Sequence, residues 1–271
     1  MSTVTISVME SIAVGPLLRD WRNRRHRSQL ELALDTGISA RHLSFVETGR
    51  SNPSPELLLK LADQLELSLR ERNRLLLAAG FAPRFQQREL DAPEMRPVRD
   101  AVGHVLAGHE PYPALAVDRH WNLVASNGAL DLLLEGVAPE LLQPPVNCMR
   151  LALHPQGLAP RILNLGQWRG HLLARLQREI ALHGDPIVED LLHEVSAYPG
   201  PRPDGTEDSH AIMVELRLAS SAGDLRLFGT VTTFGTATDI TVAELSVEAF
   251  FPADAATTEA LRAAAEQQLT V

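Results

Sequence analysis

The sequence has few of the residues and runs that would support a covalent or membrane-bound framework. Cys148 is the single cysteine among 271 residues, which excludes a disulfide framework and a zinc site built from several cysteines. No apolar run approaches the roughly 18 residues that a membrane-spanning helix needs. The first residues, MSTVTISVMESIAVG, have no basic segment before their apolar residues and do not resemble a secretory signal. We therefore expect a cytoplasmic protein with no membrane partner.

The motifs of common enzymes are missing as well. The ten histidines form no HExxH motif and no H-x-H pair, and there is no G-x-S-x-G, Walker or G-x-G-x-x-G segment. His193 and Glu194 are adjacent, so on a helix they would point about 100° apart and could not easily share a ligand. We expect no catalytic residue, no metal ligand and no cofactor. A metal site assembled from scattered histidines and aspartates stays a minor alternative.

Charge is distributed unevenly along the chain. The net charge is −9, yet residues 15–88 contain 13 basic and 8 acidic side chains, a net of +5. The remainder contains 12 basic and 26 acidic side chains, a net of −14. Such a split indicates a basic module for a polyanion, joined to an acidic module with another task. The alternative is that the arginines only solvate helices.

Five short helices are predicted within residues 15–80. Pro16 suits the first turn of a helix, and Ser54-Pro55 opens another in the same way. Two capping boxes, Ser28-Gln-Leu-Glu31 and Ser68-Leu-Arg-Glu71, mark two further helix starts. Ser39 caps a short helix that follows Gly37, a residue suited to a left-handed turn. Two helices joined by a short glycine-containing turn inside a helical bundle predict a helix-turn-helix domain.

The short helix after Ser39 has two distinct faces. Leu43 and Val46 are three residues apart and are expected to point into the core. The residues left on or near the outward face are Ala40, Arg41, His42, Ser44 and Phe45.

The spacing Ser28-Gln29…Leu32-Ala33…Gly37-Ile38-Ser39…Leu43-Ser44…Glu47…Gly49-Arg50 closely resembles the Xre/Cro-like repressor family. This resemblance implies a phosphate clamp at Gln29 and a DNA-backbone contact at Arg50. It implies base-facing positions at Ala40, Arg41, His42, Ser44 and Phe45. Arg41 has the chemistry to contact guanine O6 and N7. Phe45 would either touch a thymine methyl or belong to the core, and Glu47 would be tied internally to arginines of the first helix.

The remaining chain is predicted to form a linker and an α+β domain. Residues 1–14 form an N-terminal arm, residues 81–97 a linker with three prolines, and residues 98–271 the second domain. Alternating apolar residues and turn signals predict strands at 114–117, 121–125, 212–218, 225–234 and 240–251. Helical patterns cover 98–109, 127–134, 167–183, 185–195 and 255–268. We expect one antiparallel sheet of about five strands with helices on one face.

This order of elements resembles a PAS-like sensor. The segments HEPYPALAVDRHWNLVASN, NCMRLALHP and TVTTFGTATDITVAELSVEAFFPADAAT resemble the ligand-binding domain of MmyB-like (MltR-type) transcription regulators. The resemblance implies a cavity between sheet and helices for a small, largely apolar ligand such as a fatty-acyl chain. Trp121 and Trp168 are candidate walls, and Asn127, Asn147 and Arg150 are candidate polar groups. Four of them have a plainer alternative: core packing for the two tryptophans, helix capping for Asn127 and ion pairing for Arg150.

Together these patterns predict a ligand-responsive, sequence-specific DNA-binding transcription regulator. We expect a homodimer that places two recognition helices ~34 Å apart on double-stranded DNA with a pseudo-palindromic operator. The alternatives are a protein-interaction adaptor that uses the helical bundle and a metal-sensing regulator.

Overall fold

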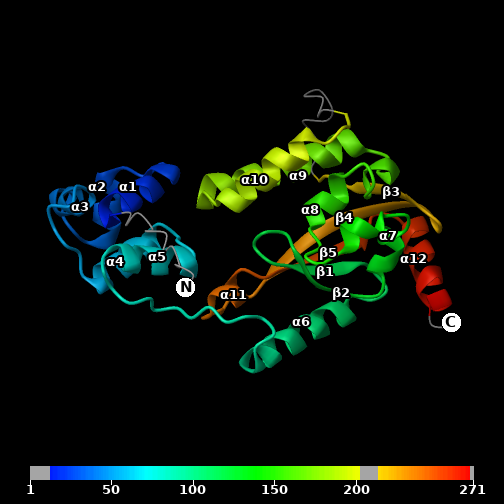
Figure 1. The fold of residues 1–271 in the computed structure, drawn as a ribbon, viewed down its shortest axis with the longest axis horizontal. Helices are drawn as coiled ribbons and strands as arrows, with labels where there is room; N and C mark the ends of the chain where they lie inside the picture. The colour runs from blue at the N-terminus through cyan, green and yellow to red at the C-terminus, as the bar shows by residue number, and fades with distance from the viewer. Residues whose placement is uncertain (1–12, 202–212, 269–271) are drawn as a thin grey trace, which may run out of the picture. The chain divides into compact units, whose positions relative to one another are not determined.

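The structure is a computed structural model that describes residues 13–201 and 213–268 (Figure 1). Its contacts divide the chain into two compact units. Unit 1 comprises Met1–Gln87 together with Thr238–Ile240, and unit 2 comprises Arg88–Ala237 and Thr241–Val271. Among the described residues, no helix is both long enough and apolar enough to cross a membrane. Most of the predicted N-terminal arm, residues 1–14, lies outside the described residues.

Unit 1 contains the five predicted helices. They are α1 (Val14–Arg24), α2 (Gln29–Thr36), α3 (Ala40–Glu47), α4 (Pro55–Gln64) and α5 (Leu69–Ala78). Both predicted capping boxes are present, because Ser28 and Ser68 each bond reciprocally with a glutamate three residues later. Gly37 ends α2 in a left-handed conformation with φ of 70°. These local signals account for the accuracy of the predicted helix starts.

The helices of unit 1 surround a core made mainly of leucine. Leu18, Leu32, Leu43 and Leu58 have no exposed surface. Helix α1 passes so close to α3 that a Cβ atom at Gly15 would lie 2.5 Å from the carbonyl oxygen of Glu47. Glycine is therefore required at this crossing, since any larger residue would push the two helices apart.

The predicted linker, residues 81–97, is divided between the two units. The Asn73 side chain accepts hydrogen bonds from the backbone N–H groups of Arg84 and Phe85 and donates one to the Phe85 carbonyl. This fixes the first part of the segment to α5. Its second part forms a short 3-10 helix, η1 (Pro93–Met95), whose Met95 is buried in unit 2.

Unit 2 is built on one antiparallel sheet with the strand order β2-β1-β5-β4-β3. The strands are β1 (Ala114–Val117), β2 (Leu123–Ser126), β3 (Leu216–Ser220), β4 (Gly223–Thr233) and β5 (Ser246–Pro252). The helices are α6 (Arg96–Gly108), α7 (Leu130–Leu134), α8 (Cys148–Leu153), α9 (Leu165–His183), α10 (Pro186–Ala197), α11 (Ile240–Ala243) and α12 (Ala255–Gln268). Two short 3-10 helices, η2 (Pro139–Leu142) and η3 (Ala159–Arg161), complete it. The predicted antiparallel α+β architecture is thus confirmed.

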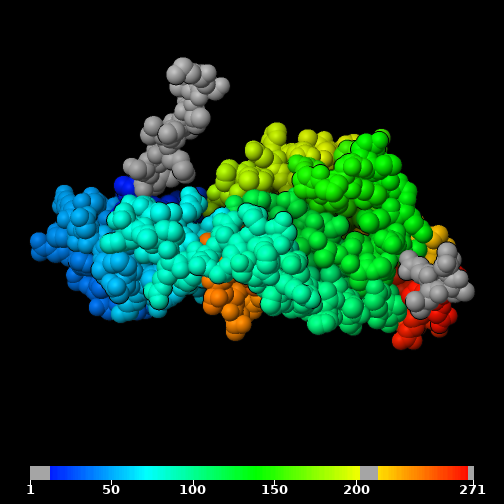
Figure 2. Space-filling model, turned by 60° about the horizontal axis from the view of Figure 1, so that its bottom comes forward, coloured from blue at the N-terminus to red at the C-terminus, as the bar shows by residue number. Residues whose placement is uncertain are grey.

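Helices cover both faces of this sheet, which corrects the expectation of a single covered face. Along β1, Ala114 and Ala116 pack with residues of α6, whereas Leu115 and Val117 join the larger core under α8 to α10. Figure 1 shows α6 on one side of the sheet and α8, α9 and α10 on the other. Figure 2 brings the α6 side forward, where α6 and the segments next to it cover the strands. Two small alanines allow the close packing of α6, while the larger residues fill the other face.

Three predicted strands differ from the observed ones. Residues 240–251 form α11 followed by β5, and not one continuous strand. Trp121 lies in the β1–β2 turn, so β2 begins only at Leu123. Strand β3 begins at Leu216, and the predicted start at Ile212 lies outside the described residues.

Candidate functional sites

Helix α3 presents the residues that were predicted to face DNA. The Ser39 hydroxyl accepts the His42 backbone N–H at 3.1 Å and so fixes the start of the helix. Leu43 and Val46 are fully buried, as predicted. Arg41 is exposed, whereas the remaining outward candidates, Ala40, His42, Ser44 and Phe45, are half-buried. Ala40 also packs against the core of unit 1, so its outward surface is small.

Behind α3 lies a buried ion pair between Arg22 of α1 and Glu47. Arg22 Nε and Nη2 lie 2.7 and 3.0 Å from the two carboxylate oxygens of Glu47. This confirms the prediction that Glu47 is tied internally to the first helix. The Gln29 amide also donates to Glu47, at 2.7 Å. The Gln29 amide has a second N–H that can donate to a phosphate, so the phosphate contact of Gln29 stays a prediction.

Phe45 and Arg50 lie at the C-terminal end of α3. Phe45 is half-buried and lies outside the cluster that forms the core of unit 1, so it is not a core residue. Gly49, with φ of 72°, reverses the chain after the helix. Arg50 follows and is exposed.

Unit 2 contains a cavity of about 620 Å³ between the sheet and its larger helical layer. This volume lies within the range of roughly 300–1,000 Å³ that is typical of ligand pockets. Apolar side chains dominate the lining, among them Leu115, Leu123, Leu130, Leu133, Leu134, Met149, Leu151, Leu158, Trp168, Leu172, Val231 and Phe250. The two tryptophans predicted as walls, Trp121 and Trp168, both line it.

One wall of the cavity is polar and contains charged side chains. It contains Arg175 and Arg178 of α9 together with Glu248 of β5. Arg175 Nη1 and Nη2 bond both oxygens of Glu248, at 3.0 and 2.6 Å, and the guanidinium lies 4.3 Å from the ring centroid of Trp121. Within the described part of the chain, Arg178 is exposed and has no hydrogen-bonding or ion-pair partner. Arg175 also lies 4.0 Å from a carboxylate oxygen of Glu179, so among the described residues Arg178 is the cation of this wall that no carboxylate pairs with.

Burial shifts the pKa values of three groups at this wall. Burial, followed by the charges of Arg175 and Arg178, lowers the pKa of His171, so this side chain is neutral at pH 7. Burial raises the pKa of the Cys148 thiol to about 12, which keeps it protonated. Burial also raises the pKa of Glu179, against the opposing effect of the hydrogen bond from Trp121 Nε1 at 3.0 Å.

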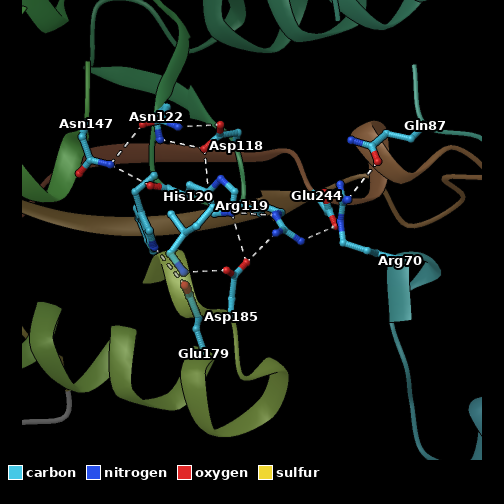
Figure 3. A network of polar contacts seen from close by, with 12 residues as sticks. Arg70, Gln87, Asp118, Arg119, His120, Asn122, Asn147, Glu179, Asp185 and Glu244 are labelled. Atoms are coloured by element: carbon cyan, nitrogen blue, oxygen red, sulfur yellow. Dashed lines mark hydrogen bonds and ion pairs between the residues drawn. The ribbon is translucent and has the colours of Figure 1, made fainter. Parts of the chain in front are cut away.

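The β1–β2 turn holds Trp121 in place. Trp121 adopts a φ of 67°, an uncommon conformation for a bulky residue. Asp118 stabilises the turn by accepting the backbone N–H groups of His120 and Asn122, at 2.8 and 2.9 Å. Asn147 donates to the His120 carbonyl at 2.8 Å (Figure 3). These bonds offset the cost of the left-handed conformation that directs the indole into the cavity lining.

The same turn is tied to α10 through charged groups. Arg119 Nη2 and His120 Nε2 lie 2.8 and 3.2 Å from one carboxylate oxygen of Asp185, the residue that caps α10 (Figure 3). The Asp185 side chain also accepts the Ile187 backbone N–H at 3.0 Å. The position of Trp121 is therefore fixed by groups of the turn itself and by the residues that cap α8 and α10.

The structure places three predicted polar ligand residues, Asn127, Asn147 and Arg150, outside the set of residues that line the cavity. Asn127 does not cap α7. Its carbonyl accepts the Ala114 N–H at 2.9 Å, and its amide donates to Leu106 and Tyr112 carbonyls. Asn147 caps α8 and holds the β1–β2 turn. Arg150 forms a bidentate pair with Glu194, with both bonds at 2.8 Å, which was the alternative considered for it.

The polar residues that do line the cavity were not predicted from the sequence. His171, Arg175 and Arg178 are spaced by four and three residues, so they share one side of α9. They lie beside the apolar stripe that includes Leu172 and Leu176. The row of basic residues beside the leucine stripe of α9 is the sequence pattern that could have indicated these lining residues. Glu248 lies 73 residues from Arg175, so no local pattern indicates that it faces the cavity.

Comparison with known proteins agrees with this combination of a helix-turn-helix unit and a cavity. Residues 98–264 match the model of the MmyB-like transcription regulator ligand binding domain, which spans more than half of the chain. Residues 18–72 match a helix-turn-helix family model. The chain therefore belongs to the MmyB-like transcription regulators, and the predicted family resemblance is confirmed.

Three individual relatives each match less than half of this chain. The ImmF control region 10 kDa protein of Bacillus phage phi105 is 34% identical over 62 residues, which cover 23% of this chain and 69% of that protein. The structure of the restriction-modification controller protein C.AhdI from Aeromonas hydrophila is 33% identical, covers 23% of this chain and 96% of its own, and has a TM-score of 0.22. The clp gene regulator ClgR from Corynebacterium glutamicum is 25% identical, with coverages of 37% and 94% and a TM-score of 0.23.

These findings define the general function. The chain is a DNA-binding helix-turn-helix transcription regulator with a ligand-binding domain. Unit 1 contains the first of these parts and unit 2 the second.

Proposed function

We propose that the protein regulates transcription through an operator affinity that is set by a small, largely apolar ligand such as a fatty acid. The supporting observation is the leucine-lined cavity of about 620 Å³ in unit 2. Each buried methylene contributes roughly 0.8 kcal/mol, so ten of them would contribute about 8 kcal/mol before the cost of ordering the ligand. An unbranched chain would therefore bind with few polar contacts.

The polar wall favours a ligand that ends in a negative charge. Arg178 is exposed and has no partner among the described residues, so its positive charge is available to a ligand at this wall. A carboxylate placed there would form a charge-assisted hydrogen bond with Arg178. Neutral His171 beside it would add a donor without adding charge. Trp121 and Trp168 would then pack along the apolar part of the ligand.

On the DNA side, we propose that α3 enters the major groove. Arg41 would read a guanine, and Ala40, His42, Ser44 and Phe45 would face the other bases. Gln29 and Arg50 would contact phosphates. A homodimer would present two such helices ~34 Å apart to a pseudo-palindromic operator. Ligand binding would shift the population between two arrangements of the dimer, through a coupling of typically 1–3 kcal/mol.

Mass spectrometry of the small molecules that co-purify with the full-length protein tests this proposal. The expected result is a mid- to long-chain monocarboxylic acid in the cavity. Its removal by delipidation should change the affinity for an operator selected from random duplex DNA, and its return should restore the original value. A protein whose operator affinity is the same with and without the bound molecule would contradict ligand control.

The salt dependence of binding tests the DNA contacts separately. The logarithm of operator affinity should fall with the logarithm of salt concentration, with a slope of about −0.9 per neutralised phosphate. A flat dependence would instead favour the protein-interaction adaptor. The metal-sensing alternative has no support in the described residues, where no group of three or more histidine, cysteine or acidic side chains could hold a metal ion. We propose a cytoplasmic regulator without catalytic activity.

A further inference from the structure

We propose that Phe45 is a positioning residue of the DNA interface, whose aromatic ring holds the guanidinium groups of Arg41 and Arg50 ready for DNA. This inference rests on the DNA-contacting role proposed above for α3. It assigns Phe45 a role that differs from both alternatives in the sequence, a core residue and a direct thymine contact.

The contact between Phe45 and Arg41 follows from their places on one helix. They are four residues apart, so their side chains lie on the same side of α3. The guanidinium carbon of Arg41 lies over the Phe45 ring, 5.2 Å from its centroid. This distance is within the ~6 Å at which a cation is attracted by the face of an aromatic ring.

The contact between Phe45 and Arg50 depends on the turn that follows α3. The Phe45 carbonyl accepts the backbone N–H groups of Arg50 and Ser51, at 2.8 and 3.2 Å. The left-handed Gly49 makes this reversal possible and returns the chain toward the ring. The guanidinium carbon of Arg50 lies over the same ring, 6.0 Å from its centroid. Phe45 thus holds Arg50 by its backbone as well as by its side chain.

Four other arginines of unit 1 pair with carboxylates. Arg22 pairs with Glu47, Arg24 with Asp20, Arg27 with Asp35 and Arg72 with Asp63. In the described part of the chain, neither Arg41 nor Arg50 has such a carboxylate partner. An aromatic ring can orient an arginine without neutralising its charge or occupying its N–H donors, which remain available to a base or a phosphate.

The ring also reduces the repulsion between the two positively charged guanidinium groups. Two exposed guanidinium groups in the same region repel each other, and long side chains lose rotamer freedom when DNA fixes them. The negative face of the ring offsets part of that repulsion and orders both groups in advance. An aliphatic side chain of similar size would fill the same volume without this attraction.

Anisotropy titrations of the full-length protein test this inference, with an operator that the wild type selects from random duplexes. Phe45→Leu should weaken binding about five- to tenfold and relax the preference at the base pair read by Arg41. Phe45→Tyr, which keeps the aromatic face, should bind within about twofold of the wild type. In an Arg41→Ala background, Phe45→Leu should cost much less than it does alone, because part of its effect acts through Arg41.

The experiment distinguishes three ways to fail. Equal costs of Phe45→Leu with and without Arg41 would overturn the positioning role. A second contrary result is that Phe45→Leu abolishes the preference at an A·T pair, both in the wild type and in the Arg41→Ala background. That result would mean that Phe45 contacts thymine directly, which also overturns the positioning role. A wild type that selects no DNA sequence would overturn the proposed function and this inference together. Circular dichroism shows whether Phe45→Leu unfolds α3. If it does, the same double-mutant cycle is measured with Phe45→Met, a flexible side chain of similar size.

Discussion

Each unit contains a bidentate Arg–Glu pair next to its candidate site, and these two pairs differ in what surrounds them. Arg22 and Glu47 are enclosed between α1 and α3, with side chains only 10% and 1% exposed. Arg175 and Glu248 join α9 to β5 at the edge of a cavity, with side chains 22% and 10% exposed. The same chemistry therefore serves a closed helix contact in one unit and an accessible wall in the other.

This difference shows that burial determines whether an ion pair stays closed or can exchange partners. A fully enclosed pair is hard to open, because a single remaining charge would have no opposite charge beside it and little access to water. A pair at a cavity can exchange partners, since solvent or a ligand can reach either member. We therefore expect a substitution in the enclosed Arg22–Glu47 pair to cost more stability than one in the Arg175–Glu248 pair, where the main effect is on ligand binding.

The largest effect is expected from Glu47→Gln. This change leaves the Arg22 charge buried without its carboxylate and should destabilise unit 1 by about 3–5 kcal/mol. Hydrogen exchange of α1 and α3 peptides in urea measures the loss. Asp20→Asn breaks the exposed Arg24–Asp20 pair in the same unit and should cost less than about 1 kcal/mol. Equal losses for the two variants would remove the distinction between enclosed and exposed pairs.

Glu248→Gln should destabilise unit 2 less, by about 1–2 kcal/mol. Arg175 keeps its contact with the Trp121 ring at 4.3 Å, and water in the cavity can solvate it. The variant should also bind dansyl-undecanoic acid more tightly, because removal of the carboxylate makes the wall more positive. A loss as large as that of Glu47→Gln, or weaker binding of the acid, would contradict the accessible-wall interpretation.

Arg178→Ala should weaken the binding of dansyl-undecanoic acid about tenfold, or 1.4 kcal/mol, with little change in stability. The methyl ester of the same probe should bind both proteins alike, since it carries no charge. Gln177→Ala is the matched control, because this exposed neighbour on α9 does not line the cavity. If Arg178→Ala weakened the acid and the ester equally, Arg178 would serve only packing.

The smallest effect is expected from pH. The pKa of His171 is lowered in the folded protein, so the unfolded chain takes up the proton first as pH falls below 6.5. The stability contribution is therefore present above pH 6.5 and is lost as pH falls through the lowered pKa. His171→Gln should flatten the decline of the urea midpoint of α9 between pH 7 and about pH 5. An equally steep decline in the variant would show that His171 does not contribute to it.

The sequence predicts best the features that are decided by near neighbours. The capping boxes at Ser28 and Ser68 mark helix starts because both partners lie within four residues. The inward positions of Leu43 and Val46 follow from helix periodicity alone. The family resemblance supplied the cavity, which periodicity cannot predict.

The features that were missed depend on contacts between distant segments. Ile240 was read as strand, yet its backbone N–H donates to the Gln86 carbonyl at 2.8 Å, more than 150 residues earlier in the chain. Asn127 was considered as a helix cap, but its side chain serves β1 and the end of α6. The partner of Arg150 lies 44 residues away. No local pattern encodes such pairings, because they arise only when the sheet assembles.

Thr238–Ile240 belongs to unit 1 although it lies far along the chain, and this affects how the two units can be expressed separately. A recombinant fragment that stops at Gln87 would lack the Gln86–Asp239 bridge and the N–H that Ile240 gives to Gln86. Its last residues would have unpaired backbone groups at a newly created end. A chimaera that exchanges sensors between regulators would need to carry this tripeptide with the helical part, since one cut cannot separate the two modules cleanly.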